Sequence, residues 1–177
     1  MKRAGNLYLV GMMGAGKTTV GRLLARRLKL RFVDADHEIE KRCGVKVPLI
    51  FDIEGESGFR ARETQTLAEL TALEGIVLAT GGGAVLGTEN RRRLADRGTV
   101  IYLRARPEDL YERVRQDRNR PLLATADPLG RLHELYVERD PLYREVADVV
   151  VDTGRQTVQS LSRTLADQLG ELWKASA

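Results

Sequence analysis

The stretch Gly11-Met-Met-Gly-Ala-Gly16-Lys17-Thr18 decides the fold. It matches the pattern G-x-x-x-x-G-K-[ST] of a phosphate-binding loop without a gap. An apolar run at residues 7–10 precedes it and a helical pattern over residues 18–30 follows it, which is the context that this loop requires. Lys17 would reach the β- and γ-phosphates, and Thr18 would bind Mg²⁺. The loop therefore predicts a site for a nucleoside triphosphate, but it does not identify the second substrate.

Five short apolar runs predict the strands of a sheet. They lie at residues 7–10, 31–34, 76–79, 99–103 and 149–152, and helical stretches separate them. Pro107 is placed as in the first turn of a helix, and apolar residues at helical spacing over 158–172 predict a terminal helix that covers one sheet face. This alternation predicts a three-layer α/β/α fold with a central five-stranded parallel sheet, the fold of P-loop nucleoside triphosphatases.

Length and composition exclude several classes of protein. The chain has 177 residues, which fits one domain spanning residues 1–177. The net charge of +4 suits a protein that handles small anions, whereas nucleic acid usually needs a clustered basic face, so no nucleic-acid partner is expected. Cys43 is the single cysteine, which excludes an intrachain disulfide and fits a reducing compartment. Because we expect neither a membrane span nor a signal peptide, we predict a cytoplasmic protein with no membrane partner.

The stretch Phe32-Val-Asp34-Ala-Asp36 ends the second predicted strand. Residues i and i+2 of a strand point to the same face, so Asp34 and Asp36 are expected to project together from its carboxyl end. One carboxylate would steady Mg²⁺ and its waters, and the other would accept a proton from a hydroxyl nucleophile. Alternatively, one or both simply cap the following helix. His37 is expected on the surface.

Three glycines, Gly81, Gly82 and Gly83, follow the third predicted strand. Glycines at this place cost backbone entropy, so they indicate that the backbone closely approaches a ligand, with a plain turn as the alternative. This strand end lacks the aspartate that many phosphate-loop proteins carry there. Asp34 is therefore the better candidate for the carboxylate that steadies Mg²⁺ and its waters.

Arg60 and Arg139 are candidates for binding an anion. Arg60 lies at the start of a predicted helix, where a cation is disfavoured unless an anion is present. Arg139 lies just before Pro141, which is expected to stop its helix. Each alone is more often a solvated side chain, but as a pair they could hold one carboxylate through forked hydrogen bonds.

A polar segment at residues 113–130 begins with four arginines in eight residues: Arg113, Arg115, Arg118 and Arg120. A charged run is usually a solvated face. Beside an ATP site it could instead be a lid that closes arginines onto the transferring phosphate and excludes water. RNA binding would require stacking aromatic residues, which are absent between the arginines.

These motifs together resemble the shikimate kinase family. They occur in the family order as GMMGAGKT, FVDAD, FR followed by Glu63, TGGG, RPLL and RDPLY, from residue 7 to about residue 155. Each is weak alone, whereas their order and spacing are specific. The resemblance implies ATP-dependent phosphorylation of the 3-hydroxyl of shikimate, with Mg²⁺ as cofactor and with ATP and shikimate as partners. We expect a monomer.

The resemblance also implies roles for individual residues. Asp36 would hold the substrate hydroxyls and is the best candidate for the base, and Lys17 and Arg120 would complete the catalytic set. Thr18 would bind Mg²⁺ directly, and Asp34 would organise it through water. The residues implied for ATP are Gly14, Ala15, Gly16, Lys17, Thr18, Thr19, Arg113, Arg120 and Arg155. The residues implied for shikimate are Asp36, Arg60, Gly81, Gly82, Gly83 and Arg139. Residues 36–60 would form a substrate-binding helical insert and residues 113–130 the lid.

Two other functions fit part of the pattern. A gluconate kinase shares the loop and the fold, and its substrate also carries a carboxylate. Such enzymes usually show a His-Pro pair after the aspartate of the second strand, and Asp36-His37-Glu38 has none. A nucleotide-binding regulatory domain would keep the phosphate loop without needing the aspartate and both arginines.

Overall fold

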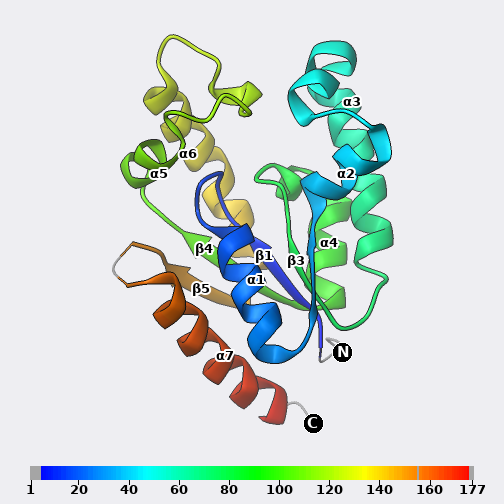
Figure 1. The fold of residues 1–177 in the computed structure, drawn as a ribbon, viewed down its shortest axis with the longest axis vertical. Helices are drawn as coiled ribbons and strands as arrows, with labels where there is room; N and C mark the ends of the chain where they lie inside the picture. The colour runs from blue at the N-terminus through cyan, green and yellow to red at the C-terminus, as the bar shows by residue number, and fades with distance from the viewer. Residues whose placement is uncertain (1–4, 155, 176–177) are drawn as a thin grey trace.

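Five parallel strands form the centre of the structure, a computed structural model that describes residues 5–154 and 156–175 (Figure 1). The strands are β1 (Leu7–Val10), β2 (Arg31–Asp34), β3 (Ile76–Ala79), β4 (Thr99–Arg104) and β5 (Val149–Asp152). Their order in the sheet is β2-β3-β1-β4-β5, and every neighbouring pair is parallel. The predicted sheet is confirmed, with β4 one residue longer than expected.

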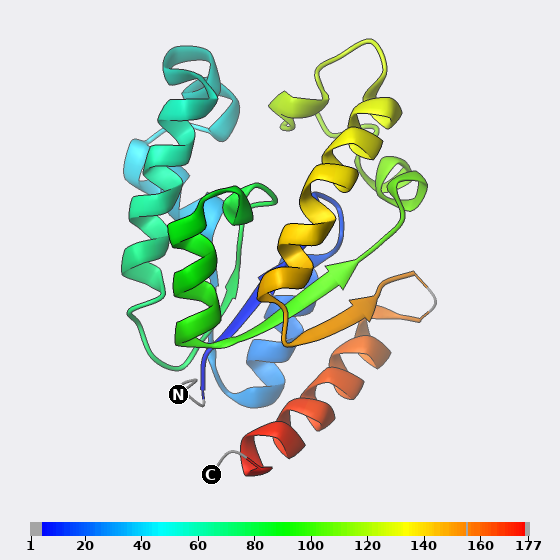
Figure 2. The same ribbon diagram turned by 180° about the vertical axis from the view of Figure 1, so that it is seen from behind.

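Helices cover both faces of this sheet. On one face α1 (Lys17–Leu28) packs against α7 (Val158–Ala175), and the predicted stripe of α7 buries Leu161, Leu165 and Leu169. On the other face lie the second half of α3 (Val47–Leu70), α4 (Thr88–Arg97) and α6 (Pro128–Val146) (Figures 1 and 2). The three-layer prediction is therefore confirmed. None of the described helices combines the length and apolar character needed to span a bilayer.

The central strands explain the unbroken apolar runs of the sequence. Every residue of β1 and β3 is buried, as is β4 up to its last residue, because helices pack on both faces. The outer strands β2 and β5 are only partly buried, since each has a neighbour on one side alone. The chain leaves β4 through α5 (Pro107–Val114), which begins at Pro107 as predicted.

The segment between β2 and β3 builds a second, smaller core. Here α2 (Ala35–Cys43) and α3 enclose Ile39, Ile50 and Phe59, separately from the main core. Gly55 interrupts α3 with φ 71° and ψ 179°, so the chain turns sharply at a residue that only glycine occupies cheaply. This segment and the residues around the short turn η2 (Pro121–Leu123) rise on opposite sides above the carboxyl ends of the strands (Figure 1).

Two local predictions were wrong. Strand β2 ends at Asp34, whose carboxylate accepts from the N–H of His37 (3.1 Å) and caps α2, so Asp36 lies in the first helical turn and not on the strand. Helix α6 does not stop before Pro141 but continues to Val146. Its last turn is held by the burial of Tyr143 and Val146, which offsets the hydrogen bond that proline cannot donate.

Candidate active site

The phosphate loop folds over the first turn of α1. Gly14 and Gly16 have φ values of 77° and 96°, which glycine adopts without the steric cost of a side chain. The Lys17 ammonium donates to the carbonyls of Gly11 (2.7 Å) and Met12 (2.8 Å), so it lies against the loop. Burial lowers the pKa of Lys17 to about 8, although the nearby Asp36 carboxylate acts in the opposite direction. A half-buried ammonium at this loop is suited to an anionic ligand.

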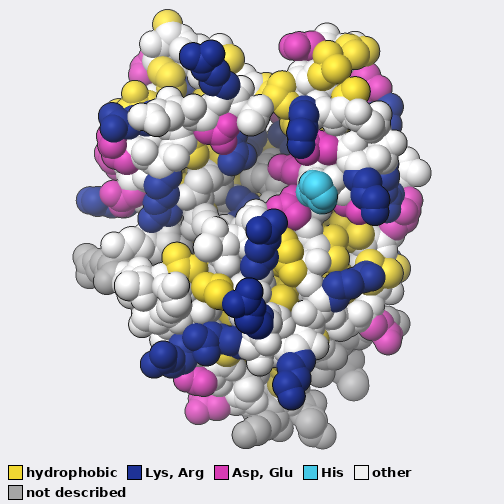
Figure 3. Space-filling view, viewed as in Figure 1, with side chains coloured by type: hydrophobic (Ala, Val, Ile, Leu, Met, Phe, Trp, Pro, Cys, Tyr) yellow, Lys and Arg dark blue, Asp and Glu magenta, His cyan; other side chains and the backbone are white. Residues whose placement is uncertain are grey.

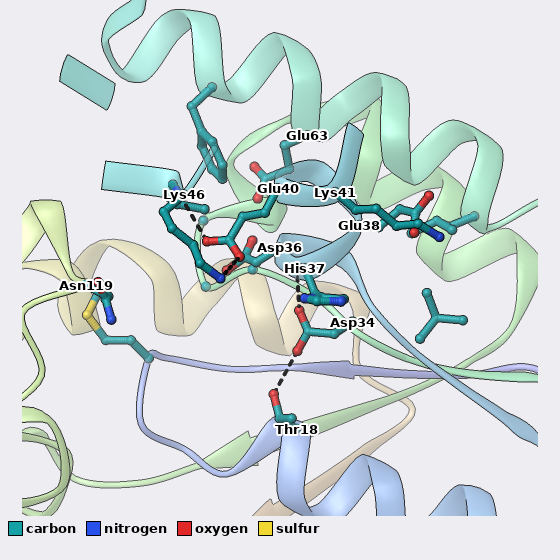
Figure 4. A pocket seen from close by; sticks show the side chains of 18 of the residues that line it. Thr18, Asp34, Asp36, His37, Glu38, Glu40, Lys41, Lys46, Glu63 and Asn119 are labelled. Atoms are coloured by element: carbon teal, nitrogen blue, oxygen red, sulfur yellow. Dashed lines mark hydrogen bonds and ion pairs between the residues drawn. The ribbon is translucent and has the colours of Figure 1, made fainter. Parts of the chain in front are cut away.

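Thr18 on α1 and Asp34 at the end of β2 point toward each other (Figure 4). The Thr18 hydroxyl donates to Asp34 Oδ2 at 2.8 Å. Both side chains offer oxygen, the ligand atom that Mg²⁺ prefers. Residues 5–154 and 156–175 contain no group of three His, Cys, Asp or Glu side chains arranged to hold a metal. These two residues therefore fit a Mg²⁺ that takes its other ligands from phosphates and water.

Two cavities meet above the carboxyl ends of the strands. The smaller, of about 590 Å³, follows the phosphate loop toward the start of α7. The larger, of about 980 Å³, extends beneath α2 and α3. Figure 3 shows this side of the molecule hollowed, with charged side chains of both signs in the hollow. Seven residues line both cavities: Met13, Thr18, Asp34, Asp36, Gly81, Gly82 and Arg120.

The structure gathers the residues expected at ATP around the smaller cavity. Its wall includes the whole stretch from Gly14 to Thr19, together with Arg113 and Arg120. Arg113 donates to the carbonyl of Gly14 at 3.0 Å, which ties the start of the arginine-rich segment to the loop. Arg155 lies outside the described residues.

Residues expected at shikimate line the larger cavity, and two buried carboxyl groups lie beside Gly81. Asp36 Oδ1 and Glu63 Oε2 are buried without a hydrogen-bond partner. A Cβ atom added to Gly81 would lie 2.8 Å and 2.7 Å from these two oxygens, which explains why glycine is needed there. Burial raises the pKa of both groups, and the charge of Asp34 raises that of Asp36 further. Two orphaned acceptors of this kind suit a ligand with several hydroxyl groups.

Arg60 and Arg139 approach the same cavity from α3 and α6. Arg60 donates to Glu63 at 2.8 Å, and a Cβ on Gly83 would collide with its guanidinium group. Arg139 is only 1% exposed, its Nε has no partner, and it forms no ion pair with any described residue. A buried charge is costly unless it is paired. The two guanidinium groups therefore suit an anion, and the glycine triplet leaves room for them.

The arginine-rich segment divides into two kinds of residue. Arg113 and Arg120 reach the cavities, whereas Arg115 and Arg118 are exposed and line neither. Arg120 donates to Asp117 at 3.0 Å and lies close enough to Lys17 and Asp36 to lower the pKa of each. In this structure, Arg113 and Arg120 are therefore the arginines of this segment that face the expected phosphate site.

Two residues of the site received no role from the sequence. Glu63 holds Arg60, and its position three residues later on one helix is the spacing of an ion pair, so this contact was accessible from the sequence. Tyr143 donates to the carbonyl of Gly82 from 61 residues away, and no local pattern indicates that bond. His37 is exposed, as expected.

A phosphate loop that shares a wall with a second cavity of buried carboxylates and arginines defines a P-loop kinase for a small hydroxylated anion. Comparison with known proteins gives the family. The model of the family described as shikimate kinase matches residues 13–170. This chain belongs to the shikimate kinase family, and it is an ATP-binding kinase of the shikimate pathway.

Individual relatives agree over nearly the whole chain. Shikimate kinase of Thiobacillus denitrificans is 62% identical over 177 residues, covering 100% of this chain and 96% of the relative. That of Ralstonia nicotianae is 64% identical over 164 residues, covering 93% and 86%. Shikimate kinase from Acinetobacter baumannii, solved in complex with shikimate, superposes with a TM-score of 0.93 at 47% identity, covering 96% of this chain and 95% of that one. A gluconokinase from Sinorhizobium meliloti shares the fold alone, with a TM-score of 0.61 at 16% identity over 99% of this chain and 97% of that chain.

Proposed function

We propose that this kinase transfers the γ-phosphoryl group of ATP to the 3-hydroxyl of shikimate at the junction of its two cavities, giving shikimate 3-phosphate and ADP. The observation that carries the proposal is the shared wall, since seven residues border both spaces. ATP would place its phosphates against the loop, and shikimate would lie in the larger cavity. The two substrates then meet at Asp36 and Arg120.

In the proposed step, the 3-hydroxyl oxygen bonds to the γ-phosphorus as the bond to the β–γ bridging oxygen breaks. Asp36 orients the hydroxyl and accepts its proton, for which its buried and unpartnered Oδ1 is suited. Lys17 and Arg120 stabilise the charge on the transferring group. Mg²⁺, held by Thr18 and through water by Asp34, would supply further neutralisation of the phosphate charge.

The carboxylate of shikimate would lie between Arg60 and Arg139, with the N–H of Gly82 as a further donor. Residues 36–60 would act as the substrate-binding insert, and residues 113–130 would close as a lid that excludes water from the γ-phosphate. A monomer that works in the cytoplasm remains a prediction from the sequence.

The test replaces each arginine by lysine and assays ADP release with shikimate and with its methyl ester. Lysine keeps the positive charge but cannot form the two parallel hydrogen bonds by which a guanidinium group holds a carboxylate. Losing a buried charged hydrogen bond costs about 2–5 kcal/mol, so the KM for shikimate should rise roughly 30-fold or more in Arg139→Lys. The rise should be smaller in Arg60→Lys, because the Arg60 side chain is 21% exposed.

The wild-type enzyme should strongly prefer shikimate over its methyl ester. Each variant should narrow that preference, while the KM for ATP changes little. Arg62→Lys is the matched control, because Arg62 lies on the same helix as Arg60 but forms an exposed pair with Glu54. Equal use of the ester and the acid by wild type would refute the carboxylate clamp.

A further inference from the structure

The buried face of α6 carries two polar interruptions. Leu132, Leu135, Arg139, Tyr143 and Val146 are the buried residues of this helix, and their spacing places them on one face. Leu132, Leu135 and Val146 are apolar residues of the main core. Arg139 and Tyr143 are four residues apart, so they are neighbours on the helix surface, and both lie beneath the glycine triplet.

Tyr143 links the two substrate-binding elements that the proposed function uses. Its hydroxyl donates to the carbonyl of Gly82, and Gly82 lines both cavities. The charge of Arg139 lies next to the same hydroxyl and opposes the rise in the pKa of Tyr143 that burial causes. The Tyr143 ring is fixed in turn by the Tyr102 ring, at a centroid distance of 4.9 Å. One phenol oxygen therefore touches the glycine loop and faces the buried guanidinium.

The bond to Gly82 fixes more than one carbonyl group. The carbonyl of Gly82 and the N–H of Gly83 belong to one planar peptide unit and point in opposite directions. When Tyr143 holds the carbonyl toward α6, the N–H of Gly83 is directed away from that helix. Within the part of the chain that the structure describes, the N–H groups of Gly82 and Gly83 donate no hydrogen bond, and both residues line the larger cavity.

We propose that Tyr143 is a positioning residue for shikimate, which sets the Gly82–Gly83 peptide unit and the Arg139 guanidinium in one arrangement that receives the substrate carboxylate. This inference rests on the proposed function, in which the N–H of Gly82 and Arg139 bind that group. The Gly82 N–H lies in the preceding peptide unit, which the fixed unit restrains through the Gly82 Cα that they share. Glycine peptides rotate easily, and Arg139 has no carboxylate partner to hold it. The phenol supplies the restraint that both of them otherwise lack.

The experiment compares Tyr143→Phe with Tyr102→Phe. Both changes remove one hydroxyl from the same pair of adjacent, tilted rings, and both hydroxyls form a hydrogen bond. That of Tyr102 donates to Asp140 at 2.8 Å, whereas only that of Tyr143 reaches the glycine loop. Each variant is assayed for the KM of shikimate, the KM of ATP, kcat and the preference for shikimate over its methyl ester. Arg139→Lys is assayed in parallel.

Tyr143→Phe should raise the KM for shikimate about tenfold, since it removes a hydrogen bond and leaves a buried carbonyl unpaired. The KM for ATP should stay within about twofold, the preference for the acid should narrow, and Tyr102→Phe should resemble wild type. A residue that only stabilises the fold would lower the melting temperature and leave the preference for the acid unchanged. That result, or equal effects of the two variants, would overturn the inference.

The Arg139→Lys variant separates a failure of this inference from a failure of the proposed function. If Arg139→Lys does not narrow the preference for shikimate over its methyl ester, the proposed carboxylate clamp itself is wrong. If Arg139→Lys narrows that preference and Tyr143→Phe does not, only the proposed role of Tyr143 is wrong. Should Tyr143→Phe fail to fold, 3-fluorotyrosine at position 143 retains the ring and the hydroxyl. Its fluorine resonance should shift with saturating shikimate and not with ATP alone, and an unchanged resonance would overturn the inference.

Discussion

Replacing Arg139 by methionine should stabilise the free enzyme and, at the same time, abolish efficient use of shikimate. Arg139 is 1% exposed, and none of the described carboxylates pairs with it. Replacing a buried ion pair by apolar side chains of similar size can stabilise a protein by roughly 1–4 kcal/mol, and Arg139 buries its charge without the compensation of a paired carboxylate. A gain of about 2 kcal/mol would raise the melting temperature of a domain this size by about 4–8 °C.

The same change should raise the KM for shikimate by roughly 30-fold or more, because the anion loses a desolvated partner. The assays are thermal unfolding with and without shikimate, and steady-state ADP release. Shikimate should stabilise the wild type against heat and stabilise Arg139→Met much less. Arg144→Met is the control on the same helix: Arg144 forms an exposed pair with Asp140, and its loss should change neither measurement appreciably. A lower melting temperature for Arg139→Met, with an unchanged KM, would refute the reasoning and make Arg139 a structural residue.

Three other predictions concern the transfer itself. Asp36→Asn should lower kcat by roughly 10²–10⁴ with little change in ATP affinity, and a normal kcat would exclude Asp36 as the base. The pKa of Lys17, lowered to about 8, means that its charged form predominates below that pH, so ATP affinity should fall by up to about tenfold per pH unit above pH 8. A dissociation constant that is flat from about pH 7 to 9.5 would contradict this. Amide exchange over residues 113–130 should slow when ATP and shikimate are both bound, and equal exchange with and without ligands would argue against a lid.

The sequence was sufficient to predict the sheet because its signals are local. Each strand is a short apolar run, and the loop between β1 and α1 carries a pattern whose glycines, lysine and threonine have separate physical reasons. The prediction from sequence fails at Asp36, because the strand periodicity ends at Asp34 and Asp36 belongs to the following helix. Asp34 ends the strand because its side chain caps the next helix, and this competes with its place in an extended run. It also accepts from Thr18, so the structural and the functional readings of this residue both apply.

Contacts between distant segments could not be predicted in the same way. From the sequence alone, Arg139 is expected to be a solvated arginine before a proline. Its burial depends on the continuation of α6 through Pro141 beneath the glycine triplet. The backbone entropy cost of three glycines indicates that glycine is required at this strand end. The sequence does not show which neighbouring atoms exclude a larger side chain. Gly81 and Gly83 are small because the side chains of Asp36, Glu63 and Arg60 occupy the space that a Cβ would need.

The distribution of unpaired polar atoms connects this packing with the substrate. In the described part of the chain, six buried side-chain nitrogen or oxygen atoms lack a hydrogen-bond partner, and four of them belong to Asp36, Glu63, Arg60 and Arg139. All four residues line the larger cavity. Burying such atoms costs stability, so their concentration at one place is evidence of a site shaped for a ligand and not for the free fold. The two acceptors need hydroxyl donors, and the Arg139 guanidinium, which has no described carboxylate partner, needs an anion. Shikimate, which carries hydroxyl groups and a carboxylate on one ring, meets both needs at once.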